Sequence, residues 1–128
     1  MKVVAVAAQT LVRLTGVILV ILGLLIWWSD SVRSLTPLHI WTGFILVLSY
    51  WVLAIAAGLA GLNAGLVVLN ILWGLFVVYF GLTHGQLLPG SAHWIIQVLH
   101  LLVGVATVGL GEWLGARVKQ ARSGGVAA

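Results

Sequence analysis

Four long apolar runs, separated by short polar or glycine-rich stretches, make up most of the chain. The runs extend over about 9–28, 37–60, 63–84 and 92–114. A helix needs about 20 apolar residues to cross the hydrocarbon core of a bilayer, and each run has that length. Thr36 followed by Pro37 is typical of a helix start, with a cap and then a proline in the first turn. The pattern predicts an all-α fold of four membrane-spanning helices in a single domain, residues 1–128.

The composition excludes a water-soluble protein. Hydrophobic residues make up 62% of the 128 residues and charged residues only 6%, whereas a soluble domain has about 25% charged residues. The mean hydropathy is +1.22. So few charged side chains cannot cover a surface that faces water, and an integral membrane protein is therefore expected. Cysteine is absent, which excludes a disulfide framework and a thiolate metal site.

The basic residues predict the orientation of the chain in the membrane. They lie near the two chain ends and in the first connection, at Lys2, Arg13, Arg33, Arg117, Lys119 and Arg122. In the first connection, the negative charge of Asp30 balances the positive charge of Arg33. The positive-inside rule then places both termini in the cytoplasm, and the short connections favour an antiparallel up-down-up-down bundle. We expect the inner (cytoplasmic) membrane of a bacterium, with the lipid bilayer and no nucleic acid as partner.

Each predicted helix carries small and polar residues on one face, at spacings of three and four residues. All four histidines of the chain lie on these faces: His39 on the second helix, His84 on the third, His93 and His100 on the fourth. Lipid offers polar side chains no partner, so these faces are expected to turn toward other helices or a cavity. His39, His84 and His93 should share a layer near the outer surface, with His100 about 10 Å deeper.

Two histidines stand in the same local pattern. His39 and His100 are each followed four residues later by a glycine, Gly43 and Gly104. A glycine one turn along the same face leaves room for the edge of a flat macrocycle. Imidazoles from facing helices of a bundle are axial ligands of haem iron. The pattern therefore predicts one bound haem b.

The choice of ligand pair stays open at this point. The glycines favour His39 with His100, whereas the expected depths favour His39 with His93. An outward extension of the fourth helix would bring the first pair level. We assign the iron to His39 and His100, with His93 or His84 beside the haem propionates or as a replacement ligand. Arg13 would meet a propionate only if the haem lay toward the inside.

With four predicted spans and histidines on the second and fourth, the chain resembles bacterial membrane cytochromes of the b561-like type. The resemblance implies a four-helix bundle that holds haem b between its helices and passes electrons to or from a quinone or a redox protein. Two-haem members carry two histidines on each ligating helix. Here the second helix offers only His39, so a single haem is expected.

Other hypotheses compete with the haem. A layer of His39, His84 and His93 would suit zinc or copper, and His100 would suit a proton relay in a small transporter. The histidines could instead bond to polar neighbours such as Gln97 or to backbone groups, which is the expectation for His84. A further alternative is a structural or anchor subunit without cofactor, in a homo-oligomer or a larger complex.

Stand-alone catalysis is not expected. The sequence has no Ser-His-Asp set, no pair of carboxylates and no phosphate-binding loop. Small four-span drug exporters depend on a glutamate within the membrane. Glu112 lies instead near the inner end of the fourth helix, close in sequence to Arg117, where an interfacial position is expected.

Overall fold

The computed structural model describes residues 1–126, and within them it contains helices and connecting segments only. The elements are α1 (Lys2–Trp28), the short 3-10 helix η1 (Asp30–Leu35), α2 (Thr36–Leu59), α3 (Ala64–Thr83), the short 3-10 helix η2 (His84–Gln86) and α4 (His93–Val126). The predicted all-α fold of four long helices is confirmed.

Two helices are longer than the apolar runs. α1 begins at Lys2 and α4 continues to Val126, where the sequence pattern had placed their ends near residues 9 and 114. Apolar runs mark only the part of a helix that suits lipid. About half of the residues in these end turns are alanine, lysine, arginine or glutamine, which are good helix formers, so the helix can continue through them.

The start of α2 also differs from its prediction. The Thr36 hydroxyl donates a hydrogen bond to the carbonyl oxygen of Arg33 at 2.8 Å and does not cap the helix. η1 leads directly into α2, so the turn before Pro37 is closed by backbone and by this hydroxyl. The tight turn before α3 is capped, since the Asn63 side chain accepts from the backbone N–H of Gly65 at 2.8 Å.

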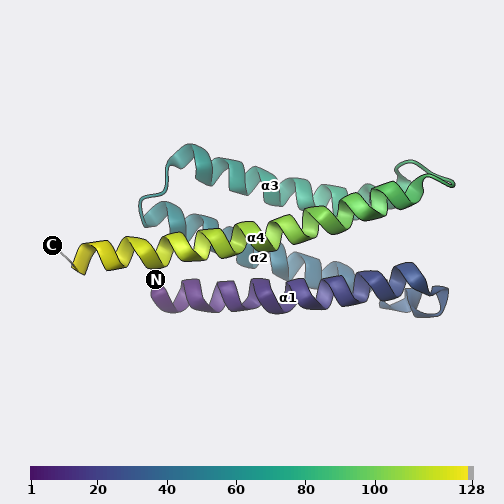
Figure 1. The fold of residues 1–128 in the computed structure, drawn as a ribbon, viewed down its shortest axis with the longest axis horizontal. Coiled ribbons are helices and arrows are strands. Elements are labelled where there is room, and N and C mark those ends of the chain that lie inside the picture. Colours follow the sequence, from purple (N-terminus) through teal and green to yellow (C-terminus); the bar gives the residue numbers. More distant parts are fainter. Residues whose placement is uncertain (127–128) are drawn as a thin grey trace.

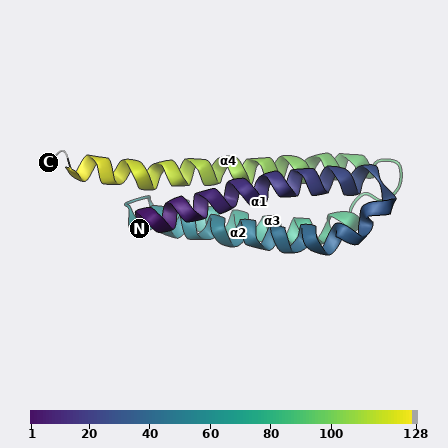
Figure 2. The same cartoon turned by 90° about the horizontal axis from the view of Figure 1, so that it is seen from below.

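The four long helices run antiparallel, up and down in turn (Figure 1). Both termini and the α2–α3 turn lie at one end of the bundle, which we call the terminal end (Figure 2). η1, η2 and the segment 87–92 lie at the other end, which we call the loop end. α2 and α4 contact each other across the bundle, whereas α1 and α3 share no contact in the described part of the chain. Two helices that run in the same direction therefore form its centre.

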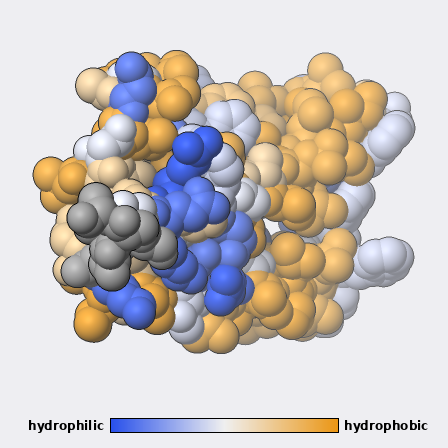
Figure 3. Space-filling model, turned by 60° about the vertical axis from the view of Figure 1, so that its left-hand side comes forward, coloured by the Kyte–Doolittle hydropathy of each residue, from blue (hydrophilic) through white to orange (hydrophobic). Residues whose placement is uncertain are grey.

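The outside of the bundle is apolar along its sides. Each of the four helices is long and apolar enough to cross a membrane. Large apolar side chains such as Leu14, Leu69 and Leu102 are exposed. Hydrophilic residues gather at the terminal end (Figure 3). An apolar band with a polar end is the surface that a membrane-spanning bundle requires.

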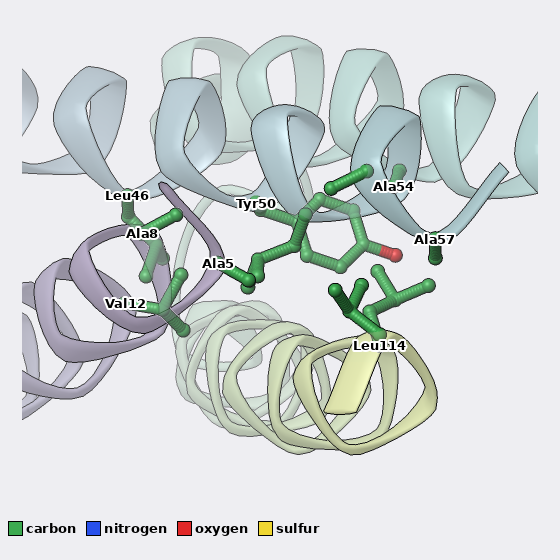
Figure 4. Close-up of a cluster of buried hydrophobic side chains, with 11 residues drawn as sticks. Ala5, Ala8, Val12, Leu46, Tyr50, Ala54, Ala57 and Leu114 are labelled. Atoms are coloured by element: carbon green, nitrogen blue, oxygen red, sulfur yellow. The ribbon is translucent and has the colours of Figure 1, made fainter. Parts of the chain in front are cut away.

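The half of the bundle toward the terminal end is closely packed around Tyr50, which is fully buried (Figure 4). Its neighbours in this core come from α1, α2 and α4 and are mostly small: Ala5, Ala8, Val12, Leu46, Ala54, Ala57 and Leu114. The Tyr50 hydroxyl donates to Oδ1 of Asn70 on α3. Asn70 in turn donates to the carbonyl oxygen of Leu66 at 2.7 Å. Small residues let the helices approach, and the buried polar groups are paired.

A polar network joins α1 to α4 at the terminal end. Arg13 binds both carboxylate oxygens of Glu112, at 2.5 Å from Nε and 2.8 Å from Nη2. Gln9 donates to the same carboxylate at 2.8 Å and accepts from Lys119 at 2.7 Å. The expected neighbour of Glu112, Arg117, lies instead over the Trp113 ring, 5.1 Å from its centre.

Candidate functional site

The half of the bundle toward the loop end contains a partly open cavity of about 1130 Å³. All four long helices line it, mostly with apolar side chains and glycines, and all four histidines of the chain reach its wall. Ligand-binding pockets usually have volumes of about 300–1,000 Å³. The cavity is therefore large enough for a sizeable, mainly apolar molecule.

Glycines create much of this space. A Cβ atom at Gly104 or Gly109 would meet no other atom within 4 Å, and one at Gly43 would only reach a methyl group of Leu19 at 4.0 Å. Gly111, further along α4, is covered by a neighbour: a Cβ there would lie 2.9 Å from Cγ1 of Val12. Gly43 and Gly104, the two glycines of the His-x-x-x-Gly pattern, both line the cavity.

Two of the histidines face each other across the centre of the bundle. His39 on α2 and His100 on α4 have ring centres 6.1 Å apart, with an angle of 48° between the ring planes. The α1 residue Gly23 makes room for one of them, because a Cβ there would lie 3.3 Å from Cε1 of His39. This glycine was on the small-residue face of the first predicted helix, yet its contact with a histidine was not predicted.

The other two histidines continue from His100 toward the loop end. The His84 ring is stacked on the His100 ring, with centres 4.3 Å apart and planes 3° apart. The centres of His84 and His93 are 6.5 Å apart. The four imidazoles thus form a row in the order His39, His100, His84, His93.

This row corrects the predicted depths. His100 was expected about 10 Å below the layer of the other three, yet it stacks on His84. The reason lies in the segment 87–92, which projects beyond η2 before α4 begins (Figure 1). α4 therefore starts further out than α3 ends, so that His100 comes level with His84 and His93 lies further out. The outward extension of α4 brings His39 and His100 together.

The hydrogen bonds separate the histidines into two pairs. Nδ1 of His84 donates to the carbonyl oxygen of Gly81 at 2.8 Å, and Nδ1 of His93 to that of Leu87 at 2.9 Å. Backbone bonding of His84 was predicted. Nδ1 of His39 and Nδ1 of His100 are buried and have no hydrogen-bond partner among the described residues.

An unpaired buried nitrogen is unfavourable, because its hydrogen bond to water has been lost and not replaced. Two polar side chains of α2 that could have bonded to these nitrogens are engaged elsewhere. Thr42 donates to the carbonyl oxygen of Leu38 at 2.7 Å, and Tyr50 bonds to Asn70. No protein hydrogen bond therefore fixes the tautomer of His39 or His100, and either ring nitrogen can bind a ligand.

A cluster for a bare metal ion is not found among the residues that the structure describes. In the part of the chain that the structure describes, no group of three or more histidine, cysteine, aspartate or glutamate residues is arranged to hold an ion. The geometry gives no support to a zinc or copper site of His39, His84 and His93. In the row of imidazoles, His100 and His84 lie between His39 and His93.

Comparisons with protein-family models, with curated proteins and with solved structures found no match to this chain. The resemblance to b561-like cytochromes therefore stays a prediction. What the cavity binds has to be inferred from its size, its apolar wall and its histidines.

Proposed function

We propose that this protein is an integral membrane cytochrome that holds one haem b between His39 and His100 and serves electron transfer. The separation of the two imidazoles carries the proposal. Two metal–imidazole bonds of about 2 Å each, together with the distance from each nitrogen to its ring centre, put the ring centres roughly 6 Å apart. The centres of His39 and His100 are 6.1 Å apart.

The surroundings of this pair support the same proposal. The cavity gives a macrocycle an apolar wall, and Gly43 and Gly104 leave space one turn from each histidine. When bound, haem supplies reversible one-electron transfer. His39 and His100 would both hold its iron, which would leave no ligand position for oxygen or a substrate. That arrangement favours an electron carrier over a catalyst.

The proposed setting is the inner membrane of a bacterium, with both termini in the cytoplasm. Four helices of membrane-crossing length and an apolar exterior support the insertion. The positive-inside rule supports the orientation, because Lys2, Lys119 and Arg117 belong to the terminal end. A quinone or a redox protein is the proposed electron partner, and a homo-oligomer or a larger membrane complex is the proposed assembly.

The test is an absorption spectrum of the purified protein in detergent, taken after expression with added haem. A reduced-minus-oxidised difference spectrum of the b type is expected. His39→Ala and His100→Ala should each abolish it, because each removes one axial ligand. His84→Ala and His93→Ala are the matched controls and should keep the low-spin spectrum, because their rings are held by backbone carbonyls.

Other outcomes would decide against haem. If the protein shows no b-type spectrum even after haem is added to it, the proposal is wrong. Zinc or copper in the same sample, measured by elemental analysis, would then favour a histidine metal site. A protein without metal that copurifies with large redox subunits would be an anchor without cofactor.

A further inference from the structure

Next to the histidine pair, the cavity wall carries polar residues on its loop-end side and glycines on its terminal-end side. Along α2, Thr36 precedes His39 and Gly43 follows it; along α4, Gln97 precedes His100 and Gly104 follows it. α2 and α4 run in the same direction, so both polar residues lie toward the loop end and both glycines toward the terminal end. At 1.5 Å per residue, the polar side chains start about 5 Å from the histidines and the glycines about 6 Å from them.

An arginine reaches the cavity at each end, and the two differ in their pairing. At the terminal end, Arg13 is held by two hydrogen bonds to Glu112, which Gln9 also contacts. At the loop end, Arg33 makes a single contact, from Nε to Oδ1 of Asp30 at 2.7 Å. Both side chains of that pair are highly exposed, and exposed ion pairs contribute little stability. Arg33 can therefore turn its remaining N–H groups to another carboxylate.

In their neutral form, the two histidines at the loop end do not bind a carboxylate. His84 and His93 both donate Nδ1–H to backbone carbonyls. Their remaining ring nitrogens are then acceptors, which a carboxylate does not bind. The donors left at this end of the cavity are the Arg33 guanidinium and the Gln97 amide.

From this division we infer that the two propionate carboxylates of the haem bind at the loop end, against Arg33 and Gln97, and that its apolar edge lies between Gly43 and Gly104. The inference rests on the proposed function. Carboxylates are costly in an apolar wall, and arginine binds them with two parallel hydrogen bonds. The Thr36 hydroxyl helps by fixing the backbone of Arg33 beside the start of α2.

The test compares haem with haem dimethyl ester, in which both propionates are neutral. Each is titrated into the haem-free full-length protein in detergent, and the dissociation constant is read from the absorption spectrum. The wild-type protein should bind haem about tenfold more tightly than the ester, as one charged hydrogen bond would give. In Arg33→Gln the two ligands should bind equally, whereas the affinity for the ester should not change.

Two further variants keep the result interpretable. Asp30→Asn releases Arg33 from its competitor and should raise the affinity for haem without changing that for the ester. Arg13→Gln is the matched control at the other end, and its preference for haem should equal that of the wild type. Circular dichroism shows that each variant keeps its helices.

The outcomes separate this inference from the proposed function. If neither ligand gives a spectrum that depends on His39 and His100, the cytochrome proposal fails. If both ligands give such a spectrum but the preference for haem survives in Arg33→Gln or is lost in Arg13→Gln, only the orientation of the haem is wrong.

Discussion

Two parts of α4, one in each half of the bundle, contain glycines whose surroundings are opposite. Toward the terminal end, a Cβ atom at Gly111 or Gly115 would lie within 3 Å of a side chain of α1. Toward the loop end, Gly104 on the same helix would gain a Cβ without meeting any atom within 4 Å. One helix thus uses glycine first to leave space and then, a few residues later, to let α1 approach.

The polar groups of the two halves differ in the same way. In the packed half, the Tyr50 hydroxyl and the Asn70 amide are buried and bonded to each other. In the hollow half, Nδ1 of His39 and Nδ1 of His100 are buried without a partner among the described residues. Close packing and paired polar groups stabilise a fold. Unfilled volume and unpaired nitrogens are features of a site built for a ligand.

The largest effect is expected from filling the cavity in the half toward the loop end with a larger side chain. Gly104→Leu should reduce the haem content of the purified protein to background, because the new side chain occupies the space beside His100. The melting temperature of the haem-free protein should stay the same or rise, since leucine has a higher helix propensity than glycine and fills a void. Haem absorbance per protein and circular dichroism during heating measure the two effects.

Gly111→Leu is the matched change in the packed half of α4. There the side chain meets Val12, so we expect a loss of about 1–3 kcal/mol in the free energy of unfolding, the usual cost of overpacking. Retained haem in Gly104→Leu, or equal stability loss in both variants, would show that the two halves do not differ as described.

A smaller effect is expected from the buried hydroxyl. Tyr50→Phe leaves Oδ1 of Asn70 buried without its partner and should lower the free energy of unfolding by about 1–3 kcal/mol. Tyr79→Phe is the control, because Tyr79 is exposed on α3 and makes no such bond. Thermal unfolding of the haem-free protein in detergent measures both. Similar melting temperatures for the two variants would mean that the Tyr50 hydroxyl does not stabilise the packed half.

The helices were predictable from the sequence because the pattern is local. Runs of apolar residues, with the polar residues between them, indicate where a helix can cross lipid. The spacing of small and polar residues indicates which face of the helix turns inward. His39, His84, His93 and His100 were predicted to face inward on this basis, and all four line the cavity.

Relative heights were not predictable, because they depend on how a loop places one helix against the next. The projection of segment 87–92 moves α4 outward, and no periodic pattern records that shift. The Arg13–Glu112 pair was missed for a similar reason. Its members are 99 residues apart, and only the packing of α1 against α4 brings them together, whereas Arg117 was the nearer partner in sequence.

The smallest effect on stability is expected from removing a charge at the terminal end of the cavity. Glu112→Gln removes the carboxylate that binds Arg13, whose side chain is 55% exposed at the terminal end. An arginine in that position can extend to water or to lipid headgroups, so the melting temperature should fall less than in Tyr50→Phe, and less still at high salt. The preference for haem over its dimethyl ester should not change, although Arg13 is now free to bind a carboxylate. An increased preference would mean that the freed Arg13 attracts the propionates. In the wild-type protein, the pairing of Arg13 with Glu112 would then direct the propionates to the loop end more than the position of Arg33 does.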